Sequence, residues 1–199
     1  MSLKYAILGF LGYAPFSGYD LKKAFDVSIQ HFWPADQSQI YRTLATLEEE
    51  GWVEMELVQQ DNRPDKKVYH ITQAGREELH CWLSAPPPLE QVRRASLIQV
   101  FFAGRLSDEE IIIMFERKAE NLRELLEKYD KIPQKSAVYA ETLDSPREVF
   151  FWMLTLEHGI KVTQAQLEWV ESVIQRFENR DLKTRNIPPV KGSKQKESK

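Results

Sequence analysis

The sequence has little of what disulfide stapling, membrane crossing or secretion requires. Its 199 residues include one cysteine, Cys81, so no disulfide can form within the chain. No apolar run approaches the roughly 20 residues that a membrane-spanning helix needs. The first residues, Met1–Leu11, do not resemble a secretion signal. We therefore expect a cytoplasmic protein that is not associated with a membrane.

Residue patterns typical of catalytic or metal-binding sites are also scarce. His31, His70, His80 and His158 share no metal-ligand spacing, and the sequence has no glycine-rich phosphate loop, nucleophile elbow or convincing carboxylate pair. Cys81 falls on a helix expected at residues 73–83, where a small buried thiol is a more common role than a nucleophile. The sequence predicts a protein that is not an enzyme and needs neither metal nor cofactor.

An excess of positive charge is absent as well. The chain has 27 Lys and Arg against 30 Asp and Glu, a formal net charge of −3. Residues 1–85 are the more acidic part, with 8 basic and 12 acidic side chains. Whole-molecule charge therefore gives no argument for nucleic-acid binding, and any affinity for DNA must come from the local arrangement of side chains.

Three consecutive prolines, Pro86–Pro88, mark the clearest break in the chain, because they donate no backbone hydrogen bonds and favour extended geometry. They predict one domain at residues 1–85 and another at 86–182. Residues 183–199 contain six basic side chains and one acid, with too few apolar residues to form a core. We expect them to be a basic disordered tail.

The first domain begins with three expected helices. Apolar residues recur at helical spacing over residues 3–11 and 20–29, and Pro34 ends the second segment. Asp36 is placed to cap a third helix, with Gln39 completing a capping box and Gly51 ending it. This helix has an apolar face formed by Ile40, Leu44 and Leu47.

The opposite face of the third helix is polar and nearly uncharged in its N-terminal half. In the DNA major groove, arginine can bind guanine with two hydrogen bonds and glutamine can bind adenine in the same way. This pattern favours a recognition helix, with a plain amphipathic surface helix as the alternative. The residues expected to contact DNA are Gln37, Ser38, Gln39, Tyr41 and Arg42.

Alternation with a period of two follows at Val53–Leu57, and a second strand is expected at residues 67–72. The polar segment between them holds the cations Arg63, Lys66 and Lys67, which we expect to contact phosphate. Three helices followed by a hairpin is the order of a winged helix-turn-helix. The expected fold is mostly α with a small β-hairpin wing, followed by a C-terminal helical dimerisation domain.

The same segments resemble the PadR family of transcriptional regulators. The matching motifs are Gly18-Tyr19-Asp20-Leu21, Gln39-Ile40-Tyr41-Arg42 and Arg63-Pro64-Asp65-Lys66-Lys67. Further along, Phe101-Phe102-Ala103-Gly104 and residues 152–169 resemble the long C-terminal domain of the subgroup related to virulence activators. The resemblance implies a homodimeric DNA-binding regulator, usually a repressor, that some small aromatic compounds such as phenolic acids release from DNA.

The second domain offers two apolar stripes at heptad-like spacing. One runs from Met153 through Leu156 and Ile160 to Phe177, and the other from Ile112 through Phe115 and Ala119 to Leu126. Such stripes favour pairing between long helices. We expect them to form a homodimer, and the alternative is a helical hairpin within one chain.

Aromatic residues in this domain suggest a small-molecule pocket, although aromatic-rich helices are more often simply core. The candidate pocket residues are Phe101, Trp152, Glu157 and His158. Together the observations predict a sequence-specific regulator, expected to be a repressor, that binds a double-stranded DNA operator as a homodimer and responds to a small aromatic effector. The alternative is an adaptor that uses the winged helix to bind protein.

Overall fold

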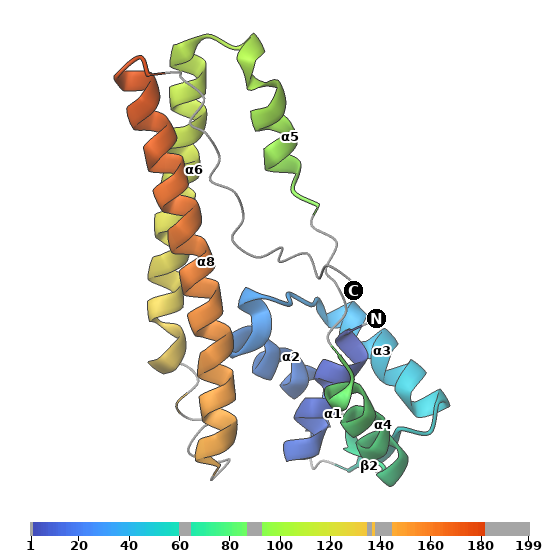
Figure 1. The fold of residues 1–199 in the computed structure, drawn as a ribbon. Coiled ribbons are helices and arrows are strands. Elements are labelled where there is room, and N and C mark those ends of the chain that lie inside the picture. Colours follow the sequence, from blue (N-terminus) through green and yellow to red (C-terminus); the bar gives the residue numbers. More distant parts are fainter. Residues whose placement is uncertain (1, 60–64, 87–92, 135–136, 138–144, 182–199) are drawn as a thin grey trace, which may run out of the picture.

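The computed structural model describes residues 2–59, 65–86, 93–134, 137 and 145–181. Short helices and a small sheet from the first part of the chain form a head (Figure 1). Two long helices lie side by side and form an arm, with a shorter helix beside its far end (Figure 1). The expected fold class, mostly helical with a winged helix-turn-helix, is confirmed.

The elements follow one another in an order that matches the expectation. The head consists of α1 (Leu3–Tyr13), β1 (Phe16–Ser17), α2 (Gly18–Val27), η1 (Ile29–His31), α3 (Gln37–Glu49), β2 (Val53–Val58), β3 (Lys66–Ile71) and α4 (Gln73–Ser84). The remainder consists of α5 (Ala95–Phe102), η2 (Ala103–Arg105), α6 (Asp108–Asp130) and α8 (Pro146–Glu178).

The head is held together by one apolar cluster to which α1, α2, α3, β2 and β3 contribute. Ile40, Leu44 and Leu47 are fully buried, which confirms the predicted apolar face of α3. Burial of such an aliphatic side chain contributes about 1.5–3 kcal/mol. The third helix is therefore anchored along one face, and its opposite face is left exposed.

The sheet has three antiparallel strands in the order β1-β3-β2. The hairpin of β2 and β3 was predicted, and the two-residue strand β1 was not. In β2 the alternation holds only at its start, where Val53 is buried, whereas Leu57 is 53% exposed. The hairpin extends past the core and projects as a wing.

The predicted apolar stripes meet within one chain. On α6 the buried residues include Ile111, Phe115 and Ala119, and they pack in one cluster with Val170 of α8. The stripe on α6 therefore passes through Ile111 and not through Ile112. Because both apolar stripes are buried where α6 packs on α8, the structure shows the hairpin within one chain. Any dimer must use other apolar surface.

Three further expectations meet different outcomes. Cys81 is exposed, contrary to the expected buried thiol, because α4 packs on α1 through neighbouring positions such as the stacked Tyr5 and Trp82. Residues 183–199, expected to be a tail, lie outside the described residues, and the domain limits stay a prediction. In the part of the chain that the structure describes, no helix is long and apolar enough to cross a membrane.

Candidate nucleic-acid interface

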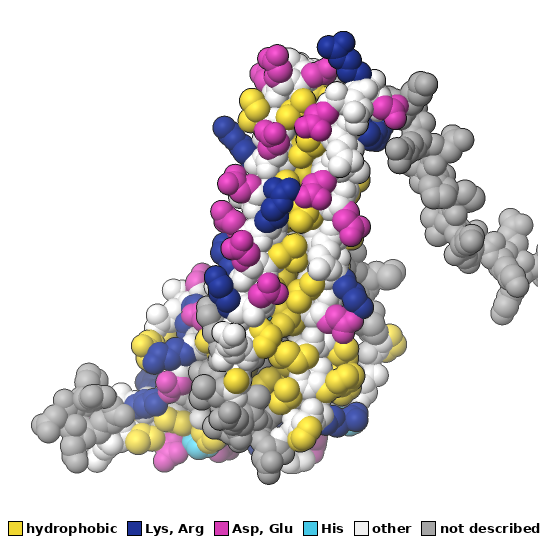
Figure 2. Space-filling view, turned by 90° about the vertical axis from the view of Figure 1, so that its left-hand side faces the viewer, with side chains coloured by type: hydrophobic (Ala, Val, Ile, Leu, Met, Phe, Trp, Pro, Cys, Tyr) yellow, Lys and Arg dark blue, Asp and Glu magenta, His cyan; other side chains and the backbone are white. Residues whose placement is uncertain are grey.

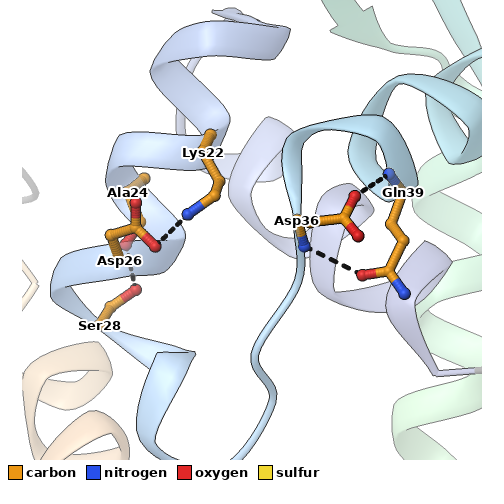
Figure 3. Close-up of polar contacts among 6 residues, drawn as sticks. All are labelled: Lys22, Ala24, Asp26, Ser28, Asp36 and Gln39. Atoms are coloured by element: carbon orange, nitrogen blue, oxygen red, sulfur yellow. Dashed lines mark hydrogen bonds and ion pairs between the residues drawn. The ribbon is translucent and has the colours of Figure 1, made fainter.

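The start of α3 is fixed by a reciprocal capping box (Figure 3). The Asp36 carboxylate accepts a hydrogen bond from the Gln39 backbone N–H at 2.7 Å, and the Gln39 side-chain oxygen accepts one from the Asp36 N–H at 2.9 Å. Two-point readout of adenine needs both the oxygen and the amino group of a glutamine. Gln39 is therefore a helix-capping residue first, and only its amino group remains available to a base.

The exposed face of α3 carries the side chains that the sequence indicated. Gln37, Ser38, Gln39 and Arg42 are exposed, and the Arg42 Nε donates to the Ser38 carbonyl at 3.3 Å. This hydrogen bond holds the guanidinium group back along the helix toward its N-terminus. The polar groups of α3 are thus gathered in its first two turns.

Tyr41 is held against the first turn of α2. A Cβ atom at Gly18 would lie only 2.5 Å from Cε1 of the Tyr41 ring, so the missing side chain of Gly18 makes room for it. Tyr41 nevertheless remains 41% exposed. The ring therefore links α2 to α3 and still presents part of its surface outward.

The wing is tied to α2 by an ion pair that the sequence did not indicate. The Lys66 ammonium lies 2.7 Å from a carboxylate oxygen of Asp20, and the Ser17 hydroxyl donates to that oxygen at 2.7 Å. The hydrogen bond from Lys66 has the largest effect on the pKa of Asp20 and lowers it; burial opposes this by a smaller amount, and the Ser17 hydroxyl lowers the pKa further. Lys67 is exposed, and Arg63 lies outside the described residues.

The acidic end of α3 lies away from this polar surface. Glu48 and Glu49 are about ten residues from Gln39, which at 1.5 Å per residue is about 15 Å along the helix. That distance exceeds the Debye length of about 8 Å at physiological ionic strength. The acidic excess of the head therefore need not repel a phosphate backbone at the N-terminal half of α3.

The four candidate effector residues are not brought together in the single chain. Phe101 is 81% exposed on α5. In Figure 1, α5 lies beside one end of the arm, and α8 begins at the opposite end. Glu157 and His158 are exposed on α8, and Glu157 pairs with Lys161. Trp152 lies elsewhere, at the contact between head and arm. The expected shared pocket is therefore not present among the described residues of one chain.

Trp152 belongs to a contact that sequence patterns could not reveal, because its members are far apart in the chain. We call this contact the head–arm seam, formed by Tyr13, His31, Tyr129, Glu148, Trp152 and Gly159. The Tyr13 hydroxyl donates to Glu148 at 2.7 Å and accepts from the Trp152 indole N–H at 3.4 Å. Burial and the Glu148 carboxylate raise the pKa of Tyr13 to about 12.

His31 occupies the same seam with one ring nitrogen unpaired. Its Nδ1 donates to the Ser28 carbonyl at 2.8 Å, so Nε2 is left as an acceptor. Nε2 is buried and has no hydrogen-bond partner within the described structure. Its ring packs edge-on against Tyr129, and both rings lie beside Gly159 of α8. His31 therefore offers one polar atom within an otherwise aromatic contact.

The arm presents a strip of apolar side chains along its length, flanked by acidic and basic residues (Figure 2). A groove of about 700 Å³ between α6 and α8 is lined mainly by charged and polar side chains, with Ile113, Ala119 and Ile174 among them. On α5, Leu97, Ile98, Phe101 and Phe102 line a shallow apolar hollow. The described residues contain no cluster of three or more potential metal ligands.

Comparison with known proteins places these features in context. Residues 7–81 match the model of the transcriptional regulator PadR-like family, and residues 92–178 match that of the virulence activator alpha C-terminal domain. The negative transcriptional regulator PadR of Bacillus subtilis is 31% identical over 173 residues, which cover 86% of this chain and 95% of that protein.

Two solved structures of that regulator resemble the whole arrangement of head and arm. The complex of Bacillus subtilis PadR with operator DNA has a TM-score of 0.75 at 30% identity and covers 89% of this chain and 99% of its own. The complex with p-coumaric acid has a TM-score of 0.72 at 28% identity, with the same coverage.

Proposed function

The chain belongs to the PadR-like family of transcriptional regulators, and on that premise we propose that it is a repressor that binds a double-stranded operator as a homodimer. The observation that carries the proposal is the polar N-terminal half of α3, exposed on a helix whose other face is buried in the head core. A related protein with the same arrangement has been solved with operator DNA.

We assign distinct roles to the exposed groups of the head. Arg42 and Gln37, with the amino group of Gln39, are placed to bind base edges, and Ser38 leaves room for close approach. Tyr41 presents a partly exposed ring beside them. Lys67 on the wing is a phosphate contact, and Arg63, which lies outside the described residues, is proposed for the same role.

Exposed apolar surface supports the homodimer. Within the described chain, α5 leaves Leu97, Ile98, Phe101 and Phe102 largely in solvent, and the apolar strip of the arm is also uncovered (Figure 2). Contiguous apolar patches of this kind mark interaction sites. A second copy is the partner that we propose, because a dimer presents two recognition helices to a two-fold operator.

A small aromatic effector is proposed to act at the head–arm seam. Trp152 lies there with Tyr13, and the buried His31 Nε2 can accept a hydrogen bond from a phenolic hydroxyl group. A related regulator has been solved with p-coumaric acid. A ligand inserted at this seam would change how the head sits on the arm, and so would change DNA affinity.

Fluorescence anisotropy with a fragment of the protein's own upstream region and a random fragment tests the proposal. We expect Arg42→Ala or Tyr41→Ala to cost about 1–3 kcal/mol on the operator and to relax sequence preference, and Lys67→Ala to weaken both fragments alike. Addition of p-coumaric acid should quench Trp152 and release the operator. Equal weak binding to both fragments at every salt concentration would favour the protein-binding adaptor instead.

A further inference from the structure

The first turn of α2 contacts both elements that face DNA in the proposed function, and Asp20 is the charged residue at that point. We propose that Asp20 is a positioning residue that holds the wing at a fixed angle to α3 by binding Lys66, and that this angle sets operator preference. The inference rests on the proposed DNA binding and gives Lys66 a role other than the phosphate contact expected from sequence.

The position of the ion pair indicates that it fixes the wing in place. Lys66 is the first residue of β3, and its pairing partner is Val58, the last residue of β2. The bond from Asp20 therefore reaches the hairpin at the outer end of its described pairing. Asp20 is itself oriented by the Ser17 hydroxyl, which also accepts from the Asp20 backbone N–H at 3.2 Å.

The same turn of α2 is fixed relative to the recognition helix. Gly18 packs beneath the Tyr41 ring, and Ser17 in β1 pairs with Val68 of β3. The chain from Ser17 to Asp20 thus contacts α3 on one side and β3 on the other. Loss of the Asp20 contact would release the outer end of β3 from α2, while β1 and the core residue Tyr69 would still hold the inner part of the strand.

A phosphate-binding role for Lys66 makes the opposite prediction. If Asp20 only masked a phosphate-binding lysine, removing the carboxylate would free a cation and tighten binding to all DNA. It would also steepen the salt dependence by about one unit of log K per log of salt concentration. If Asp20 positions the wing, removing it weakens operator binding selectively. Both side chains of the pair are about a third or more exposed, so the pair itself adds little to stability.

The test uses a double variant that leaves net charge unchanged, Asp20→Asn with Lys66→Met, in the full-length chain. We expect operator affinity to fall about fivefold or more, with binding to random DNA and the unfolding midpoint nearly unchanged. The matched control is Asp26→Asn with Lys22→Met, which removes another ion pair of α2 that does not reach the wing (Figure 3). Asp20→Glu, which keeps the carboxylate, should retain operator preference within about twofold.

Amide hydrogen exchange in the free protein adds a readout that needs no DNA. The first double variant should exchange faster than wild type in β3, and the Lys22 and Asp26 control should not. An unchanged operator-to-random ratio in the first variant overturns the inference, as does tighter binding of Asp20→Asn to both DNAs. If wild type shows no operator preference, the proposed function fails. The role of Asp20 in holding the wing is then judged from exchange alone, and unchanged exchange in β3 of the first double variant excludes it.

Discussion

Among single residues, Gly75 in the first turn of α4 offers a prediction whose sign runs against helix propensity. An alanine in a helix is favoured over glycine by about 1 kcal/mol. At Gly75, however, an added Cβ would lie 2.2 Å from the Trp52 backbone oxygen, which accepts a hydrogen bond from Thr72 N–H. Because a backbone atom cannot swing aside, we expect Gly75→Ala to destabilise the protein by about 1–3 kcal/mol in urea unfolding.

Gly9 on α1 provides the control for that substitution. Nothing lies within 4 Å of a Cβ built there, so Gly9→Ala should be neutral or stabilising by up to about 1 kcal/mol. Similar losses of stability for both variants would contradict the contact argument.

The residue pattern could predict that Ile40 and Leu44 are buried, because helical periodicity is local. It could not predict the Gly75 contact or the exposure of Cys81, which depend on how α4 packs on distant elements.

Within the element α3, stability and recognition can be separated at its N-terminus. Asp36→Ala removes the cap and should cost about 0.5–2 kcal/mol of stability. Gln39→Glu keeps an oxygen that can accept from the Asp36 N–H, so stability should be unchanged while the loss of the amino group and the new negative charge weaken operator binding. Thermal unfolding and anisotropy on the two variants check this separation. A Gln39→Glu variant as unstable as Asp36→Ala would show that the oxygen does not carry the cap.

Element boundaries were largely predictable, because caps and prolines are short-range signals. Asp36 and Gly51 mark the two ends of α3 as expected, and Gly51 has the positive φ of 74° that favours glycine. The helix α2 begins at Gly18, two residues before the expected start at residue 20. The strand β1 was missed because two residues carry no periodicity, and it exists only through pairing with β3. The ion pair of Asp20 and Lys66 was missed because it joins two residues that are far apart in the sequence.

At the scale of the whole molecule, the apolar surface of α5 gives a test of the dimer. Phe101 is 81% exposed, so a charge there should not disturb the fold of a lone chain. We expect Phe101→Glu to shift sedimentation from dimer to monomer and to lower operator affinity at a given protein concentration. Glu109→Gln, at an exposed position of α6, serves as the control. A Phe101→Glu variant that stays dimeric would place the interface on the arm strip instead.

The head–arm seam makes unfolding depend on pH in a particular window. The pKa of Tyr13 is raised to about 12 in the folded chain, above its ordinary value of 10, by burial and by the Glu148 carboxylate. A raised pKa means that folding favours the protonated phenol, so this contribution is present below pH 10 and is lost as pH rises toward 12. We expect wild type to lose stability over that window more steeply than Tyr13→Phe, which has no proton to lose. Glu148→Gln removes the carboxylate and should move this loss of stability to lower pH. Identical pH profiles for wild type and Tyr13→Phe would exclude Tyr13 as the titrating contact between head and arm.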